Sequence, residues 1–173
     1  MVVRIIEIVP YDEAWPSLFM AEAQRLGQIL RDVVAIHHIG STSVPGLAAK
    51  PIIDILLEVN TIGALDAQTQ TLSALGYEAK GEFGIAGRRY FAKGGMQRTH
   101  QVHAFARGDP NVTRHLAFRD YLRAHPGVAS EYADLKRRVA ASCQNDIVAY
   151  SAGKRAFIQT HEAAALKWRS SAA

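Results

Sequence analysis

Apolar residues occur along the first two thirds of the chain as short runs between turn-forming residues, and along the last third at helical spacing. The short runs are rich in β-branched residues and predict six strands, at residues 2–9, 35–40, 52–59, 77–82, 88–93 and 99–106. Apolar positions three and four residues apart predict five helices, at residues 12–33, 61–75, 111–125, 128–143 and 146–168. Gly94 and Gly95 predict a hairpin between the last two strands.

Strands and helices alternate early in the chain, and helices cluster at its end. This order predicts an α/β (α+β) fold, with a mixed β-sheet flanked by helices and a C-terminal helical cap. No linker, repeat or low-complexity segment interrupts the 173 residues. We therefore expect a single domain over residues 1–173, with its sheet at about residues 1–106 and its C-terminal helices at about 111–169.

The composition is that of an ordinary globular domain and excludes several classes of protein. An apolar fraction of 49% and a charged fraction of 21% exclude a disordered chain, a collagen and a coiled-coil rod. A single cysteine, Cys143, excludes an internal disulfide and a zinc site built on several thiolates. Apolar runs fall short of a membrane span, and the first residues lack the order of a signal peptide. We expect a cytoplasmic protein without a membrane partner.

The formal net charge of +4 is unevenly distributed along the chain. Residues 80–123 hold nine Lys and Arg residues against three Asp and Glu residues. A local excess of this kind predicts an anionic partner, although a solvated surface accounts for it equally well. Because the segment lacks clustered basic residues interleaved with aromatic ones, a small phosphorylated ligand fits it better than nucleic acid.

The candidate chemistry lies between His37 and Val59. The Gly40-Ser41 turn between two apolar runs offers backbone N–H groups and a hydroxyl, which suit a phosphate. Asp54 interrupts a buried strand, where a carboxylate is costly unless it is paired or holds a metal ion. Together these features predict an anion-binding turn beside a metal-holding carboxylate.

This segment resembles the nucleotidyltransferase superfamily, in which Gly-Ser follows an apolar strand and a later strand carries two acidic residues separated by one. The resemblance implies phosphoryl transfer, with Mg²⁺ held by carboxylates against a triphosphate. Here Leu56 occupies the second acidic position. Glu58 would lie on the same strand face as Asp54, but roughly 13 Å away. A catalytic site with an altered ligand set and a non-catalytic binding site therefore both stay open.

A second resemblance covers almost the whole chain. The run from His38 to Ile55 reads HIGSTSVPGLAAKPIIDI and resembles the GrpB family, as do residues 9–16, 87–91, 98–100, 115–123 and 154–158. It implies a nucleotidyltransferase-like fold but little about activity, and relatives fused to dephospho-CoA kinase point to nucleotide or coenzyme metabolism. The family usually has histidines at both positions 101 and 103. Gln101 in this chain argues against a two-histidine metal site and leaves His103 as a candidate general base.

The preferred interpretation is a nucleotidyltransferase-like protein that binds a nucleotide or another phosphorylated small molecule and transfers a nucleotidyl group to a small acceptor. The catalytic candidates are Asp54 and His103, and the candidate Mg²⁺ ligands are Asp54 and Glu58. The candidate ligand contacts are Gly40, Ser41, Thr42, Lys50, Arg88, Arg89, His100 and Arg119. Lys154 and Arg155 are expected on the solvent side of the last helix. The alternatives are a non-catalytic phosphate-binding module of the same fold and, third, a nucleic-acid-binding module.

Overall fold

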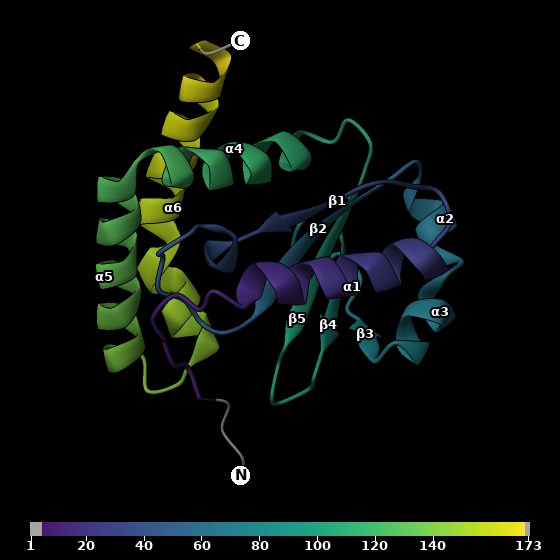
Figure 1. The fold of residues 1–173 in the computed structure, drawn as a ribbon, viewed down its shortest axis with the longest axis horizontal. Coiled ribbons are helices and arrows are strands. Elements are labelled where there is room, and N and C mark those ends of the chain that lie inside the picture. The colour runs from purple at the N-terminus through teal and green to yellow at the C-terminus, as the bar shows by residue number, and fades with distance from the viewer. Residues whose placement is uncertain (1–4, 172–173) are drawn as a thin grey trace.

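The computed structural model describes residues 5–171, and within them five strands form one mixed sheet in the order β1-β2-β5-β4-β3 (Figure 1). The strands are β1 (Val33–Ile39), β2 (Ile53–Val59), β3 (Tyr77–Ala79), β4 (Arg89–Lys93) and β5 (His100–Ala106). β2 and β5 run parallel, and the other neighbouring pairs are antiparallel. The predicted mixed sheet is confirmed, and the apolar run at residues 52–59 supplies one of its inner strands.

Helices flank this sheet and gather beyond one end of it (Figure 1). They are α1 (Trp15–Ile29), α2 (Ile62–Asp66), α3 (Thr69–Ala74), α4 (Pro110–Ala124), α5 (Pro126–Ser142) and α6 (Ile147–Ser171), with a 3-10 turn at Ser41–Ser43. α1 lies across one face and buries Leu26 against Ile55 and Leu57. On the opposite face, Leu56 and Phe105 pack against Val112 of α4. The predicted C-terminal group of helices is confirmed.

Two predicted elements differ from the structure. Residues 2–4 of the predicted first strand lie outside the described residues, and of the remainder only Val9 pairs, through an isolated antiparallel bridge to Ala49. Pro10 follows directly and has no N–H to extend a ladder. The predicted helix at residues 61–75 is two short helices with Gln68 between them, where a tertiary contact holds the break: the Gln68 side chain exchanges hydrogen bonds of 2.7 and 3.2 Å with the Arg31 backbone.

Within residues 5–171, no helix combines the length and the apolar character that crossing a lipid bilayer requires.

Candidate phosphate-binding cleft

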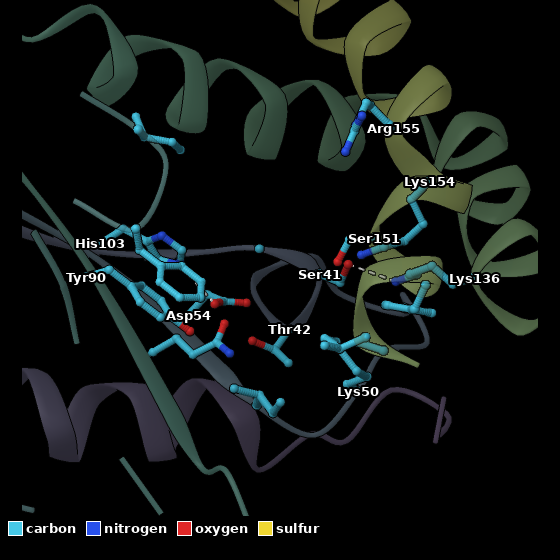
Figure 2. A pocket seen from close by; sticks show the side chains of 18 of the residues that line it. Ser41, Thr42, Lys50, Asp54, Tyr90, His103, Lys136, Ser151, Lys154 and Arg155 are labelled. Carbon is cyan, nitrogen blue, oxygen red and sulfur yellow. Dashed lines mark hydrogen bonds and ion pairs between the residues drawn. The ribbon is translucent and has the colours of Figure 1, made fainter. Parts of the chain in front are cut away.

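A cleft of about 950 Å³ opens between the Ser41–Ser43 turn, the sheet and helices α5 and α6 (Figure 2). Seven of the predicted site residues line it: Gly40, Ser41, Thr42, Lys50, Asp54, Arg88 and His103. These residues come from the turn, from β2 and β5, and from the segments that precede β2 and β4. The fold thus brings together groups up to 63 positions apart, if one counts from Gly40 to His103.

Gly40 lies directly against Asp54 in this cleft. β1 and β2 pair so that Ile39 lies opposite Asp54, and Gly40 follows with a φ of 71° and a ψ of −175°. A Cβ atom at position 40 would lie 2.6 Å from Asp54 Oδ2, so the position requires glycine on two independent grounds. The Ser43 N–H then donates to the Gly40 carbonyl at 3.1 Å and closes the turn.

His103 connects Asp54 to a buried arginine. His103 Nε2 lies 3.2 Å from Asp54 Oδ1, and His103 Nδ1 lies 3.3 Å from Arg88 Nη1. A guanidinium can only donate, so Nδ1 accepts, and Nε2 is the nitrogen that carries hydrogen and donates it to Asp54. Both ring nitrogens of His103 are therefore engaged. Asp54 Oδ2, on the Gly40 side, is the oxygen that His103 leaves unused.

The loop before β4 is held in place by Arg88. This side chain is only 6% exposed, and it donates to the carbonyls of Glu82 at 3.1 Å and Phe83 at 2.6 Å. Burial lowers the pKa of Arg88, but a guanidinium stays charged at neutral pH. Arg88 therefore fixes both the loop and the His103 ring, and it adds a positive charge to the wall of the cleft.

Lys136 of α5 is the most buried cation of the cleft, with 2% of its surface exposed. Its ammonium group donates to Ser41 Oγ at 2.8 Å and to the Ala48 carbonyl, and it lies 4.6 Å from the centre of the Tyr132 ring (Figure 2). Burial and the nearby charge of Lys154 lower the pKa of Lys136 to about 7. A buried ammonium group whose pKa is lowered has too little negative charge nearby to stabilise its protonated form.

Lys154 and Arg155 of α6 line the same cleft, which corrects their expected position on the solvent side of the helix. Lys154 and Lys50 lie 4.3 and 4.9 Å from the centre of the same Tyr150 ring. Burial and the charge of Lys50 lower the pKa of Lys154 to about 8. The two ammonium groups approach each other because the packing of α6 places both against one aromatic ring.

The described lining holds six cationic side chains and one carboxylate, Asp54; the cations are Lys50, Arg88, Arg114, Lys136, Lys154 and Arg155, of which Arg114 forms an ion pair with Glu162. Of the nine basic residues in the segment 80–123, only Arg88 and Arg114 belong to this set. The positive charge of the cleft therefore comes mostly from segments other than residues 80–123, whose predicted excess of charge is not gathered there. Such a concentration of one sign raises the local concentration of anions.

Four predicted site residues lie elsewhere, each held by a different partner. Glu58 accepts from His37 Nε2 at 2.7 Å, and Arg89 forms two hydrogen bonds of 2.7 and 2.8 Å with Asp66. The remaining two are Arg119 and His100. Arg119 donates to Asp120 at 2.8 Å and to the His38 carbonyl at 3.2 Å.

His100 is separated from the cleft by the sheet. It alternates with Gln101 and His103 along β5, so its side chain lies on the α1 face, where Glu22 and Lys93 are its charged neighbours. Burial lowers the pKa of His100.

The predicted pairing of Asp54 and Glu58 around Mg²⁺ is not assembled. Leu56 stands between them and is fully buried, and Glu58 lies outside the cleft with its carboxylate bound to His37. Within residues 5–171, no three His, Cys, Asp or Glu side chains are grouped so that they could hold a metal ion. The donors present do not fit a metal ion held by the protein alone.

One sequence signal could have identified Lys136 and Lys154. On α5, Ala129, Tyr132, Ala133 and Lys136 are all buried and follow the spacing of one helix face. Lys154 likewise follows Tyr150 by four positions and precedes Phe157 by three. A lysine at an apolar position of an amphipathic helix is directed toward the interior, where it needs a partner.

Comparison with known proteins identifies the family of the chain. The family model described as GrpB protein matches residues 5–164. The chain belongs to the GrpB family. Its fold superposes on the crystal structure of conserved protein GrpB from Enterococcus faecalis with a TM-score of 0.90 and 45% identity, over 94% of this chain and 99% of that one.

Two curated relatives of this GrpB chain are much longer than the chain itself. UPF0157 protein YqkA of Bacillus subtilis (strain 168) is 51% identical over 167 residues, which are 96% of this chain and 49% of YqkA. A dephospho-CoA kinase of Mycolicibacterium paratuberculosis (strain ATCC BAA-968 / K-10) is 28% identical over 96% of this chain and 47% of the kinase. The chain therefore spans about half the length of these two proteins.

Proposed function

We propose that the cleft binds a phosphorylated small molecule, with the phosphate groups beside the Ser41 turn and the lysines of α5 and α6. The observation that carries this proposal is the set of six cationic side chains around one carboxylate in the described lining. Charge-assisted hydrogen bonds from such groups are the usual means of binding phosphate. A polyphosphate would supply the negative charge that Lys136 and Lys154 lack, and it would raise their pKa values from about 7 and about 8.

Magnesium has a limited place in this proposal. Proteins often bind Mg²⁺ through one or two carboxylates together with phosphate oxygens of the substrate. Asp54 is the one carboxylate in the described lining of the cleft. A Mg²⁺ ion that arrived with a phosphorylated molecule could therefore be coordinated by Asp54 and by phosphate oxygens, with no second carboxylate from the cleft. The cationic side chains can neutralise phosphate without a metal ion, and binding is therefore expected to persist when Mg²⁺ is removed.

A second function, nucleotidyl transfer to a small acceptor, is favoured by the geometry of Asp54. His103 donates to Asp54 Oδ1 and fixes the carboxylate, while Oδ2 remains for a hydroxyl proton. In such a reaction the acceptor oxygen attacks the α-phosphorus, pyrophosphate leaves, and Asp54 takes the acceptor proton. Asp54 would then be the base and His103 its positioning residue. In a non-catalytic module the same cleft would bind the ligand without releasing pyrophosphate.

The proposal is tested by calorimetric titration of ATP, of inorganic tripolyphosphate and of coenzyme A precursors, each with and without Mg²⁺. The variant Lys154→Met removes one ammonium group of the cleft, and Lys167→Met, at an exposed position of the same helix, is its matched control. Lys154→Met is expected to weaken polyphosphate binding by roughly tenfold, the effect of one charge-assisted hydrogen bond. Lys167→Met should leave it unchanged.

Absence of binding by the wild type, or an equal loss in both variants, would contradict the phosphate site. A parallel assay for pyrophosphate release, with ATP and a panel of hydroxyl and amine acceptors, separates the transferase from the binding module.

A further inference from the structure

An exposed phenylalanine lies on the wall of this cationic cleft. Phe83 is 65% exposed and lines the cleft together with Tyr90. Its ring stacks on that of Tyr90, with a centroid distance of 5.0 Å and an angle of 20° between the planes. One face of Phe83 is thus supported from behind, and most of the side chain is open to solvent. A supported aromatic ring beside cations differs from an ordinary exposed apolar side chain.

The backbone of Phe83 is held in an unfavourable conformation. Its φ is 47°, a left-handed value that is uncommon for residues with a side chain and costs free energy. Several hydrogen bonds hold the loop in this conformation and offset its free-energy cost. Arg88 donates to the carbonyls of Glu82 and Phe83, and the Gly87 N–H donates to Glu82 Oε1 at 2.8 Å. Strained residues of this kind cluster at active sites, ligand clamps and switch regions.

The cleft has two chemically different sides. Figure 2 shows Tyr90, His103 and Asp54 on one side, and Ser151, Lys136 and Lys154 on the other. Phe83 extends the first side, because its ring stacks on Tyr90. A volume of about 950 Å³ lies within the range of small-molecule sites, so one ligand can contact both sides. Such a ligand would have a flat aromatic ring at one end and phosphate groups at the other.

We infer that Phe83 is the stacking platform for a nucleobase, so that the phosphorylated ligand of this cleft is a nucleotide. The inference rests on the proposed function, since the lysines must hold the phosphate groups of the same ligand. Any nucleobase can stack on an aromatic ring, so Phe83 selects for the presence of a base and little for its identity. Polar groups beside the ring would have to distinguish one base from another.

The test compares a ligand that has a base with one that lacks it. ATP and inorganic tripolyphosphate are titrated into the wild type, Phe83→Ala, Phe83→Tyr and the control Met96→Ala. Met96 is 52% exposed and lies outside the cleft. Phe83→Ala should weaken ATP binding by roughly 5- to 100-fold, the usual effect of removing a stacking ring. Tripolyphosphate binding should stay within about twofold, because it makes no base contact. Phe83→Tyr and Met96→Ala should bind ATP as the wild type does.

The outcomes separate the inference from the proposed function. If both ligands bind the wild type and Phe83→Ala leaves ATP binding unchanged, the stacking platform is wrong and the phosphate site stands. If Phe83→Ala weakens both ligands equally, the loop shapes the phosphate site, and the inference is also wrong. If neither ligand binds the wild type, the proposed function itself fails. Thermal unfolding of each variant checks that the exposed substitution leaves the fold intact.

Discussion

Strand β2 carries two carboxylates on the same face, each paired with a histidine of a neighbouring strand, and only one of the two pairs belongs to the cleft. Asp54 pairs with His103 at 3.2 Å, and Glu58 pairs with His37 at 2.7 Å. By distance alone the Glu58 pair is the better formed. Asp54, however, lies among six cations of the described lining and against the Gly40 turn. A histidine–carboxylate pair therefore becomes a candidate site through the groups around it, and not through its own geometry.

The strand register explains the difference between the two pairs. Asp54 lies opposite Ile39 at the end of β1, where the chain enters the Gly40 turn, whereas Glu58 lies opposite Ala35 near the other end. Leu56 between them is fully buried and packs with Ile39 in a small apolar cluster. This apolar cluster separates the two pairs on the face of the sheet. Four substitutions or conditions, in decreasing order of expected effect, test the distinction between the two pairs.

The largest loss of stability is expected from Gly40→Ala, because the Asp54 pair lies against Gly40 and the Glu58 pair has no such neighbour. The new Cβ would lie 2.6 Å from Asp54 Oδ2, in a backbone conformation with a φ of 71°. Strain and displacement of Asp54 together should lower the free energy of unfolding by about 3 kcal/mol, as measured by urea denaturation. Ligand binding in the cleft should be weakened as well.

Gly46→Ala is the matched control for this substitution. Gly46 also has a positive φ, 79°, but nothing lies within 4 Å of an added Cβ. Gly46→Ala should lower the free energy of unfolding by about 1 kcal/mol, the cost of placing a side chain at a positive φ without a steric clash. Equal losses in the two variants would show that the contact of Gly40 with Asp54 is unimportant.

Local sequence patterns predicted the part of the site that lies close together in the chain. The Gly40-Ser41 turn and Asp54 belong to two neighbouring paired strands, and each has a marked local pattern of its own: a turn in the first case, a polar residue in an apolar run in the second. The inner strand β2 has an equally clear pattern, because burial on both faces requires a nearly unbroken apolar run.

The remaining part depended on contacts that no local pattern contains. Lys136 and Lys154 reach the cleft because α5 and α6 fold back beside the turn, 95 positions away in the case of Lys136 and Ser41. Arg89 and Arg88 are neighbours in sequence, but one pairs with Asp66 and the other with His103, as alternation along a strand requires. The predicted helix at residues 61–75 failed for a similar reason, a tertiary contact of Gln68.

The second prediction concerns pH, since only the Asp54 pair has titrating lysines around it. An anion binds best when Lys136 and Lys154, with pKa values of about 7 and about 8, are both protonated. Phosphate affinity should therefore fall as the pH rises from 7 to 9, by about tenfold for each lysine that loses its proton. Calorimetry in two buffers of different ionisation enthalpy should show proton uptake on binding near pH 7.5.

Stability of the ligand-free protein should change in the opposite direction. The unfolded chain keeps Lys136 protonated up to about pH 10.5, whereas the folded chain loses that proton at about 7. Between these values the unfolded state binds more protons, so the contribution of Lys136 to stability rises with pH. Lys136→Met should remove the Lys136 part of this slope and leave the part above about pH 8 that comes from Lys154, whereas Lys167→Met should keep both parts. Affinity and stability that are both flat between pH 7 and 9 would contradict the assignment.

The third prediction sets the two carboxylates directly against each other. Without divalent cations, Asp54→Asn should strengthen tripolyphosphate binding several-fold, because it removes the negative charge that would face the phosphates. The expected gain is on the order of 1 kcal/mol for one charge in a partly solvated cleft. Calorimetric titration measures it. If Asp54→Asn binds more weakly under these conditions, Asp54 must contact the ligand directly as a hydrogen-bond acceptor, and the charge argument is wrong.

The smallest effect is expected from Glu58→Gln. The His37–Glu58 pair is partly exposed and makes no contact with the cleft lining, so its loss should cost only about 0.5–1 kcal/mol of unfolding free energy. Tripolyphosphate affinity should stay within about twofold of wild type at every pH, since the ion pair lies beyond the buried Leu56. A change in affinity comparable to that of Asp54→Asn would mean that both carboxylates act on one ligand. The register of β2 would then have to differ in the bound state, and the distinction between the two pairs would not hold.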